Sequence, residues 1–128
     1  MEKKKIIKDY LNDVVNQNAN SLREYFTKNA SILWHCTNEL FNVEEYIIAI
    51  CEYPGAWNGE IERCDEIGDT VLSISRVWVT DESMSFHVTS FYEFDGSKIV
   101  KLDEYYGDDG VAPQWRLDKQ IGKQIINR

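Results

Sequence analysis

Apolar residues in the first part of the chain follow a helical period. From Ile6 they recur one, three and four positions apart, which is the stripe of an amphipathic helix. The stripe consists of Ile6, Ile7, Tyr10, Leu11, Val14 and Val15, and the polar run 16–20 ends it. Ser21-Leu22-Arg23-Glu24 has capping-box spacing, which predicts a second short helix from Ser21 with Leu22, Tyr25 and Phe26 facing inward.

The next segments predict a strand and a third helix. Residues 30–36 form a compact apolar run between polar residues, which is typical of a strand. Asn42-Val43-Glu44-Glu45 has the composition of a helix start. Pro54-Gly55 predicts the end of that helix, because proline cannot continue the helical hydrogen bonding and glycine tolerates the turn.

After Trp57 the pattern changes to that of strands. Four β-rich runs cover 60–67, 70–80, 83–94 and 98–106, and short sequences typical of hairpin turns separate them. Such short connections predict an antiparallel meander. Helices followed by a meander indicate an α+β domain whose helices pack on one face of a curved sheet. We expect one domain over 1–128, with a tail from about residue 111.

The third β-rich run has two semi-apolar faces. Met84, Phe86, Val88, Ser90, Tyr92 and Phe94 share one face, and Ser85, His87, Thr89, Phe91 and Glu93 share the other. A sheet that is apolar on both faces predicts helices and a pocket on one side and a partner on the other. The simplest closed arrangement is a homodimer through the sheet face.

Composition narrows the class of partner and the compartment. The 128 residues carry a net charge of −8, which argues against nucleic acid and against an anionic membrane surface. The sequence shows no transmembrane stretch and no secretion signal. The three cysteines, Cys36, Cys51 and Cys64, are widely spaced and predict reduced thiols. We therefore expect a cytoplasmic protein.

Three local segments and the order of the elements carry a resemblance to a known family. The segments are 30–35 (ASILWH), 94–99 (FDGSKI) and 103–108 (DEYYGD). With the order helix, helix, strand, helix, meander, the chain resembles the nuclear transport factor 2-like superfamily, and within it the SnoaL-like group of small bacterial proteins. Blocks 34–39, 51–57 and 85–91 are similar to an uncharacterised branch of that group.

The resemblance implies a cone, or cystatin-like α+β roll, in which a bent sheet wraps around the helices and leaves a deep apolar pocket. Ketosteroid isomerases, polyketide cyclases, dehydratases, epoxide hydrolases and non-catalytic binders share this form. By the resemblance, Trp34 and Ser90 stand where the isomerases have two aspartates, which argues against isomerase activity of that type. The resemblance also places Leu102, Glu104 and Tyr106 on the pocket side of the last strand.

Glu104 is the leading candidate for chemistry. A carboxylate on the inward face is desolvated, which raises its pKa and suits a general acid or base. The structural alternative is a buried pair with Arg76. Tyr106 and Ser90 are the expected hydrogen-bond donors to a carbonyl or hydroxyl group of the substrate. His87 has the opposite parity to Ser90 and is expected to face the dimer or solvent.

The remaining candidates line the pocket or are rejected. The expected ligand-binding residues are Trp34, Cys36, Tyr53, Trp57, Val88, Tyr92 and Leu102. His35, Cys36 and Glu39 do not have the spacing of a metal site, so no metal and no cofactor is expected. Asp108-Asp109-Gly110 is interpreted as a solvated turn, and Trp115-Arg116 as a segment that folds across the pocket mouth or a partner subunit.

The leading hypothesis is therefore a cofactor-free enzyme of the isomerase, cyclase, dehydratase or hydrolase type, acting on a small, largely apolar molecule. A non-catalytic small-ligand-binding protein and a protein-interaction module are the alternatives. The sequence names no substrate.

Overall fold

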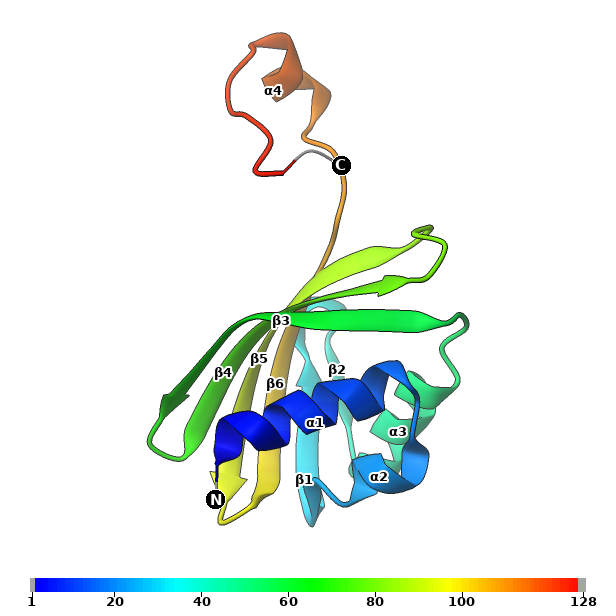
Figure 1. Ribbon diagram of the computed structural model, residues 1–128, viewed down its shortest axis with the longest axis vertical. Coiled ribbons are helices and arrows are strands. Elements are labelled where there is room, and N and C mark those ends of the chain that lie inside the picture. The colour runs from blue at the N-terminus through cyan, green and yellow to red at the C-terminus, as the bar shows by residue number, and fades with distance from the viewer. Residues whose placement is uncertain (1, 127–128) are drawn as a thin grey trace.

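The computed structural model describes residues 2–126. The elements, shown in Figure 1, are α1 (Lys3–Val15), α2 (Ala19–Arg23), β1 (Phe26–Trp34), the 3-10 helix η1 (His35–Thr37), β2 (Glu39–Phe41), α3 (Val43–Cys51), β3 (Trp57–Ile67), β4 (Thr70–Val79), β5 (Ser85–Asp95), β6 (Lys98–Asp108) and α4 (Gln114–Asp118). Helices precede the long strands, as the sequence pattern predicts.

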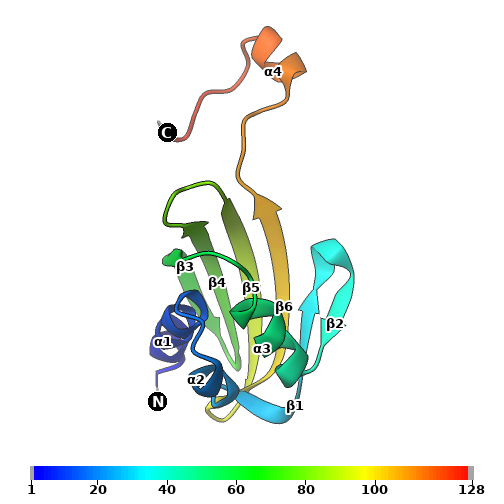
Figure 2. The same cartoon turned by 90° about the vertical axis from the view of Figure 1, so that its right-hand side faces the viewer.

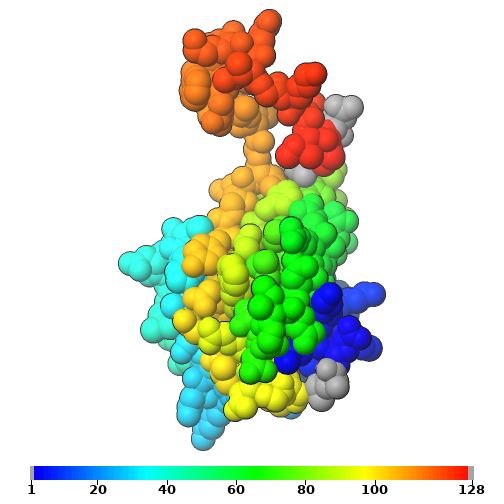
Figure 3. Space-filling model, turned by 90° about the vertical axis from the view of Figure 1, so that its left-hand side faces the viewer, coloured from blue at the N-terminus to red at the C-terminus, as the bar shows by residue number. Residues whose placement is uncertain are grey.

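The strands form one sheet in the order β2-β1-β6-β5-β4-β3. The meander β3 to β6 is antiparallel throughout, and β1 joins it as a parallel neighbour of β6. The sheet curves around α1, α2 and α3, which cover its inner face (Figures 1 and 2). In the described part of the chain, residues 2–126, no helix lies on the outer face (Figure 3). The predicted α+β roll is confirmed.

Helix α1 packs on the inner face because its apolar stripe matches the concave sheet. Ile7 and Tyr10 are buried, and the helix lies against β3. At the crossing point the sheet has Gly59, where a Cβ would lie 2.9 Å from Cγ1 of Val15. Glycine therefore permits the close approach of the helix to the strand.

Helix α3 starts as the sequence predicts. The Asn42 side chain accepts a hydrogen bond from the Glu45 backbone N–H at 2.8 Å, and the Glu45 side chain accepts one from the Asn42 N–H at 2.9 Å. This reciprocal capping box satisfies two N–H groups that have no partner inside the helix. It fixes the start of the helix that supplies one wall of the cavity described below.

Two predicted boundaries in the first third of the chain are wrong. Helix α2 begins at Ala19, with Asn18 at the N-cap position, and ends at Arg23. Phe26 is not on this helix: it opens β1, where it is buried and pairs with Ile99 of β6. Long-range sheet pairing overrides the local capping signal at Ser21.

The predicted strand over 30–36 also ends too late. It stops at Trp34, and η1 turns the chain so that the left-handed Asn38 leads into β2, a short edge strand that the sequence analysis missed. Cys36 therefore lies on a helical turn, and strand parity does not determine its direction.

Two of the four later strands are longer than predicted, each at one end, whereas β4 and β5 differ from the predicted ranges by one or two residues. Strand β3 begins at Trp57 and β6 continues to Asp108. Beyond them, residues 110–126 project from the end of β6 and carry the short helix α4, and every one of these residues is exposed (Figure 2). Among residues 2–126, no helix is long and apolar enough to cross a membrane.

Candidate functional site

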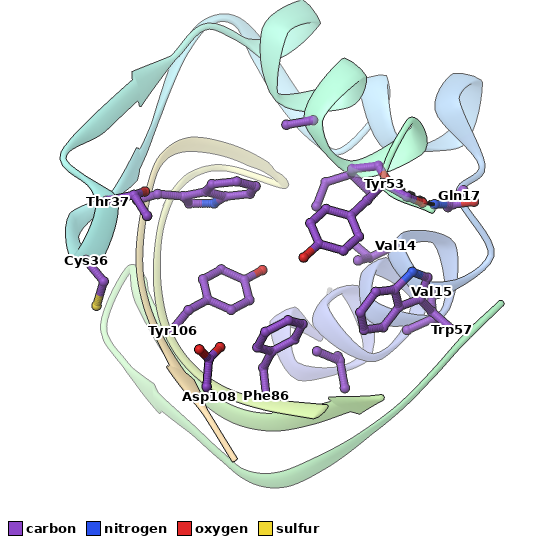
Figure 4. Close-up of a pocket in the computed structure, with 14 residues that line it drawn as sticks. Val14, Val15, Gln17, Cys36, Thr37, Tyr53, Trp57, Phe86, Tyr106 and Asp108 are labelled. Atoms are coloured by element: carbon purple, nitrogen blue, oxygen red, sulfur yellow. Dashed lines mark hydrogen bonds between the residues drawn. The ribbon is translucent and has the colours of Figure 1, made fainter. Parts of the chain in front are cut away.

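A cavity of about 240 Å³ lies between the C-terminal ends of α1 and α3 and the inner face of the sheet (Figure 4). Its lining is mostly aromatic and aliphatic. The lining residues are Val14, Val15, Gln17, Trp34, Cys36, Thr37, Ala49, Ile50, Tyr53, Trp57, Val77, Phe86, Tyr106 and Asp108. A cavity of this size and composition suits a small apolar molecule.

Five of the lining residues are aromatic, and four of them form a continuous row. Trp57 and Phe86 stack with ring centroids 5.7 Å apart, Phe86 meets Tyr106 edge to face at 6.2 Å, and Tyr106 meets Trp34 edge to face at 5.5 Å. A row of flat rings favours a flat guest, because offset stacking and edge contacts add to apolar burial.

Two phenol groups point into the cavity. The hydroxyl groups of Tyr53 and Tyr106 are directed toward its centre from opposite sides (Figure 4). Burial raises the pKa of Tyr106 well above its ordinary value, and the nearby Glu104 raises it further. The phenol therefore stays protonated and can donate a hydrogen bond to an oxygen atom of a guest.

Glu104 lies behind this wall. It is 4% exposed and is not among the lining residues. The Ser90 hydroxyl donates to its Oε2 at 2.7 Å, and the indole N–H of Trp34 donates to its Oε1 at 3.1 Å. Trp34 thus touches both the cavity and the carboxyl group.

The electrostatic surroundings of Glu104 raise its pKa. Desolvation is the largest cause, and the hydrogen bonds from Ser90 and Trp34 oppose it. Within residues 2–126, no Lys, Arg or His forms an ion pair with this carboxyl group. Arg76, the structural alternative partner, lies on the outer face, stacked on Trp78 with its Nε 3.8 Å from Asp109.

A cluster of tyrosines surrounds the buried carboxyl group. The hydroxyl groups of Tyr10 and Tyr46 are hydrogen-bonded to each other, and that of Tyr92 lies 3.1 Å from the Ser73 hydroxyl. Burial raises the pKa of all three phenols, and the charge of Glu104 contributes to each increase. These hydroxyl groups are hydrogen-bonded to each other and to Ser73, and they interact with the carboxyl group of Glu104 through its charge.

Some of the expected site residues line the cavity, and the others are buried behind its wall. Trp34, Cys36, Tyr53, Trp57 and Tyr106 line the cavity. Ser90, Glu104, Val88, Tyr92 and Leu102 are on the inner face but are buried outside the cavity lining. Because the Ser90 hydroxyl donates to Glu104, it orients the carboxyl group instead of pointing at a guest.

Comparisons with known proteins rest on structure alone. No family model matches the sequence, and no curated protein is significantly similar to it. A candidate ketosteroid isomerase from Kribbella flavida superimposes with a TM-score of 0.79 at 12% identity, over 98% of this chain and 90% of its own. An NTF2-like protein of unknown function from Burkholderia xenovorans gives 0.72 at 19% identity, over 96% and 98% of the two chains.

The chain has the nuclear transport factor 2-like fold. A third neighbour, an LEH-like epoxide hydrolase of M. tuberculosis, gives a TM-score of 0.65 at 14% identity over 79% of each chain. Neighbours thus include candidate and named enzymes as well as proteins of unknown function. At these identities the similarity establishes the fold of this chain and leaves its activity to be argued from its own residues.

Within this nuclear transport factor 2-like fold, sequence reasoning missed several cavity residues. Phe86 shares the parity of Val88, and Asp108 shares that of Glu104 and Tyr106, so alternation could have found both. The contributions of α1 and α3, such as Gln17 and Ala49, depend on helix placement, which has no local signal.

His87 lies on the outer face, as its parity predicts. Its Nδ1 is hydrogen-bonded to Asp109 and its Nε2 lies 3.3 Å from Glu62. The hydrogen bond with Asp109 is the largest cause of a raised pKa of His87. In the described part of the chain, no group of three His, Cys, Asp or Glu side chains could hold a metal ion.

Proposed function

We propose that the protein binds a small, flat, largely apolar molecule carrying a hydroxyl or carbonyl group, in the cavity between α1, α3 and the sheet. The observation that carries this proposal is the pair of phenol groups, Tyr53 and Tyr106, directed into an aromatic cavity of about 240 Å³ (Figure 4). The apolar wall supports affinity by burial, and the two phenols support orientation of a single polar group.

A titration with 2-naphthol, which is flat, apolar and bears one hydroxyl group, tests this function. Its fluorescence is expected to change saturably on addition of the protein. Ala49→Phe fills the cavity from α3 and is expected to weaken binding by at least about tenfold. Ile48→Phe adds a ring one position earlier on the same helix, where the side chain is exposed, and is the matched control.

Equal binding by both variants would place the probe outside the cavity and overturn the proposal. Absence of saturable binding by the unmodified protein, across a series of naphthols and small ketones, would overturn it as well.

A second candidate function, proton transfer on the bound molecule, is favoured by Glu104. A buried carboxyl group without a cationic partner is costly to maintain, and such groups concentrate at sites of acid–base chemistry. Burial raises the pKa of Glu104, which favours the protonated form that a general acid needs. Glu104 does not line the cavity, but Trp34, which does, donates a hydrogen bond to its carboxyl group, so proton transfer to a guest requires a rearrangement of the cavity wall.

Hydrogen–deuterium exchange at the carbon beside the carbonyl group of 2-tetralone, followed by NMR in D₂O, tests for this activity without assuming a natural substrate. Proton-transfer chemistry predicts saturable acceleration by the unmodified protein and its loss in Glu104→Gln, with 2-tetralone affinity retained. Binding of 2-tetralone without acceleration would leave binding as the function and exclude Glu104 as a base toward this ketone.

A further inference from the structure

The C-terminal arm, defined as residues 110–126, does not pack against the core of its own chain. It projects away from the end of β6 in both views (Figures 1 and 2). All of its residues are exposed, and they include many large apolar side chains: Val111, Trp115, Leu117, Ile121, Ile125 and Ile126. A run of uncovered apolar groups of this size is typical of a binding surface.

The hydrogen bonds of the arm are internal to it. That from the Gln114 side chain to Asp118 is one example, and the backbone N–H groups of residues 116–121 that are hydrogen-bonded donate to carbonyl groups of residues 113–117. Helix α4 has only five residues, which is too short for a helix to be stable by itself in water. A partner that covers its apolar side chains would stabilise it.

The root of the arm is fixed on the sheet. The Asp109 N–H donates to the Ser85 carbonyl at 3.0 Å, and the Asp109 carboxylate is hydrogen-bonded to the Ser85 hydroxyl and to His87. These contacts direct the arm away from the body of its own chain, so a partner is better placed than this chain to cover it.

The outer face of the sheet is a second apolar surface, on which two aromatic side chains are exposed. We define it by Leu72, Ile74, Trp78, Phe91 and Tyr105 on β4, β5 and β6. Phe91 is 38% exposed and Tyr105 43%, and their rings are in edge-to-face contact. Figure 3 shows the outer sides of these strands with no other segment lying over them.

The arm and the rest of the chain have opposite net charges. Residues 110–126 contain three Lys and Arg against one acidic residue, a net charge of +2, whereas residues 1–109 contain ten against twenty-one, a net charge of −11. On the outer face Glu60, Glu62 and Glu93 lie around the apolar patch, together with Arg76 and Lys101. The opposite net charges favour association of the arm with the body of a second copy.

We propose that the arm of one copy docks on the outer face of a second copy, and the reverse, in a two-fold symmetric dimer. A second copy carries both surfaces, so one association covers two arms and two faces and leaves neither surface open. The proposal is independent of what the cavity binds.

Sedimentation of the full-length chain tests the arm and the face separately. The arm variant is Trp115→Ser with Leu117→Ser, the face variant is Phe91→Ser with Tyr105→Ser, and the control is Leu40→Ser with Ile48→Ser. All six side chains are exposed, so the core is unaffected. The unmodified protein is expected to be dimeric, each of the first two variants to dissociate about tenfold more readily or worse, and the control to match the unmodified protein.

Mixing the two variants distinguishes arm docking from direct packing of one sheet on another. The face variant still has an intact arm and the arm variant an intact face, so the mixture is expected to form heterodimers at a concentration where each variant alone is monomeric. A dimer that the arm variant leaves unchanged would overturn the proposal. So would a mixture without heterodimers, or an unmodified protein that stays monomeric.

Discussion

The indole N–H of Trp34 donates a hydrogen bond to Oε1 of Glu104 at 3.1 Å, across two parallel strands in which these residues are direct neighbours. One side of the indole lines the cavity, so Trp34 links the contents of the cavity to the ionisation of a carboxyl group that the solvent does not reach.

Replacement of Trp34 by Phe removes this donor. Because the hydrogen bond lowers the pKa of Glu104 against the effect of burial, its loss is expected to raise that pKa. The titration of the Glu104 carboxyl carbon by NMR measures the change. Trp57 lines the same cavity, but its indole N–H donates to the Pro54 carbonyl, so Trp57→Phe is expected to leave the pKa of Glu104 unchanged. An unchanged or lower midpoint in Trp34→Phe would contradict this account.

Replacement of Glu104 by Gln is expected to change how stability depends on pH. The folded-state pKa of Glu104 is raised above its ordinary value of 4.5. Its protonated form therefore fits the fold better, and the associated stability is present below that value and is lost as the pH rises through the folded-state pKa. Gln keeps a carbonyl for Trp34 and cannot ionise, so Glu104→Gln is expected to melt above the unmodified protein at neutral pH.

The melting difference is expected to vanish toward pH 4, about where unfolded carboxyl groups protonate. Glu52→Gln, at an exposed position, is the control and is expected to show no such dependence. An equal loss of stability at every pH in Glu104→Gln would show that the ionisation of Glu104 does not affect the stability of the fold.

The sequence predicted which residues face the interior better than it predicted which of them reach the cavity. Alternation grouped Ser90 with Val88 on one strand face, and the resemblance placed Glu104 and Tyr106 on the pocket side. The structure has all of these residues on the inner face. The sequence could not show that Tyr106 reaches the cavity while Glu104 stays behind the wall. That difference depends on where Trp34 and the ends of α1 and α3 lie, which long-range packing determines.

Local signals failed where a distant partner decided the conformation. The capping spacing at Ser21 predicts a helix that includes Phe26, but Phe26 instead pairs with Ile99 in the sheet. After Trp34, η1 ends at Asn38, whose backbone is left-handed and turns the chain into β2. The interpretation of Asp108 as part of a solvated turn is wrong: Asp108 pairs with Phe86 at the end of β6 and lines the cavity.

Gly59 is expected to be intolerant of alanine. The new Cβ would lie 2.9 Å from Val15 and 3.3 Å from Val77, two side chains that line the cavity. Overpacking of this kind costs about 1–3 kcal/mol of unfolding free energy. Gly107→Ala, where nothing lies within 4 Å, is the matched control. Equal stability of the two variants in urea would show that α1 does not rest closely on β3.

His87 is expected to stabilise the fold when it is protonated. Asp109, Glu62 and Arg76 face it, and the hydrogen bond with Asp109 is the largest cause of its raised pKa. A raised pKa means that the stabilisation is fully present below the unfolded-state value of about 6.5 and is lost as the pH rises through the folded-state value.

His87→Gln is therefore expected to lower the melting temperature more at about pH 6 than at about pH 9. Thermal melts of both proteins across this range measure the difference. A larger deficit at the alkaline end would show that His87 acts through its neutral form.

The position of a bound guest is the most direct test of the central claim, that the aromatic cavity is a ligand site. Intermolecular NOEs between 2-naphthol and the protein report which methyl groups lie beside it. The account predicts NOEs to Ile50 and Val77 in the unmodified protein and their absence in Ala49→Phe. NOEs to Ile74 or Leu72 on the outer face, with none to the cavity methyl groups, would contradict it.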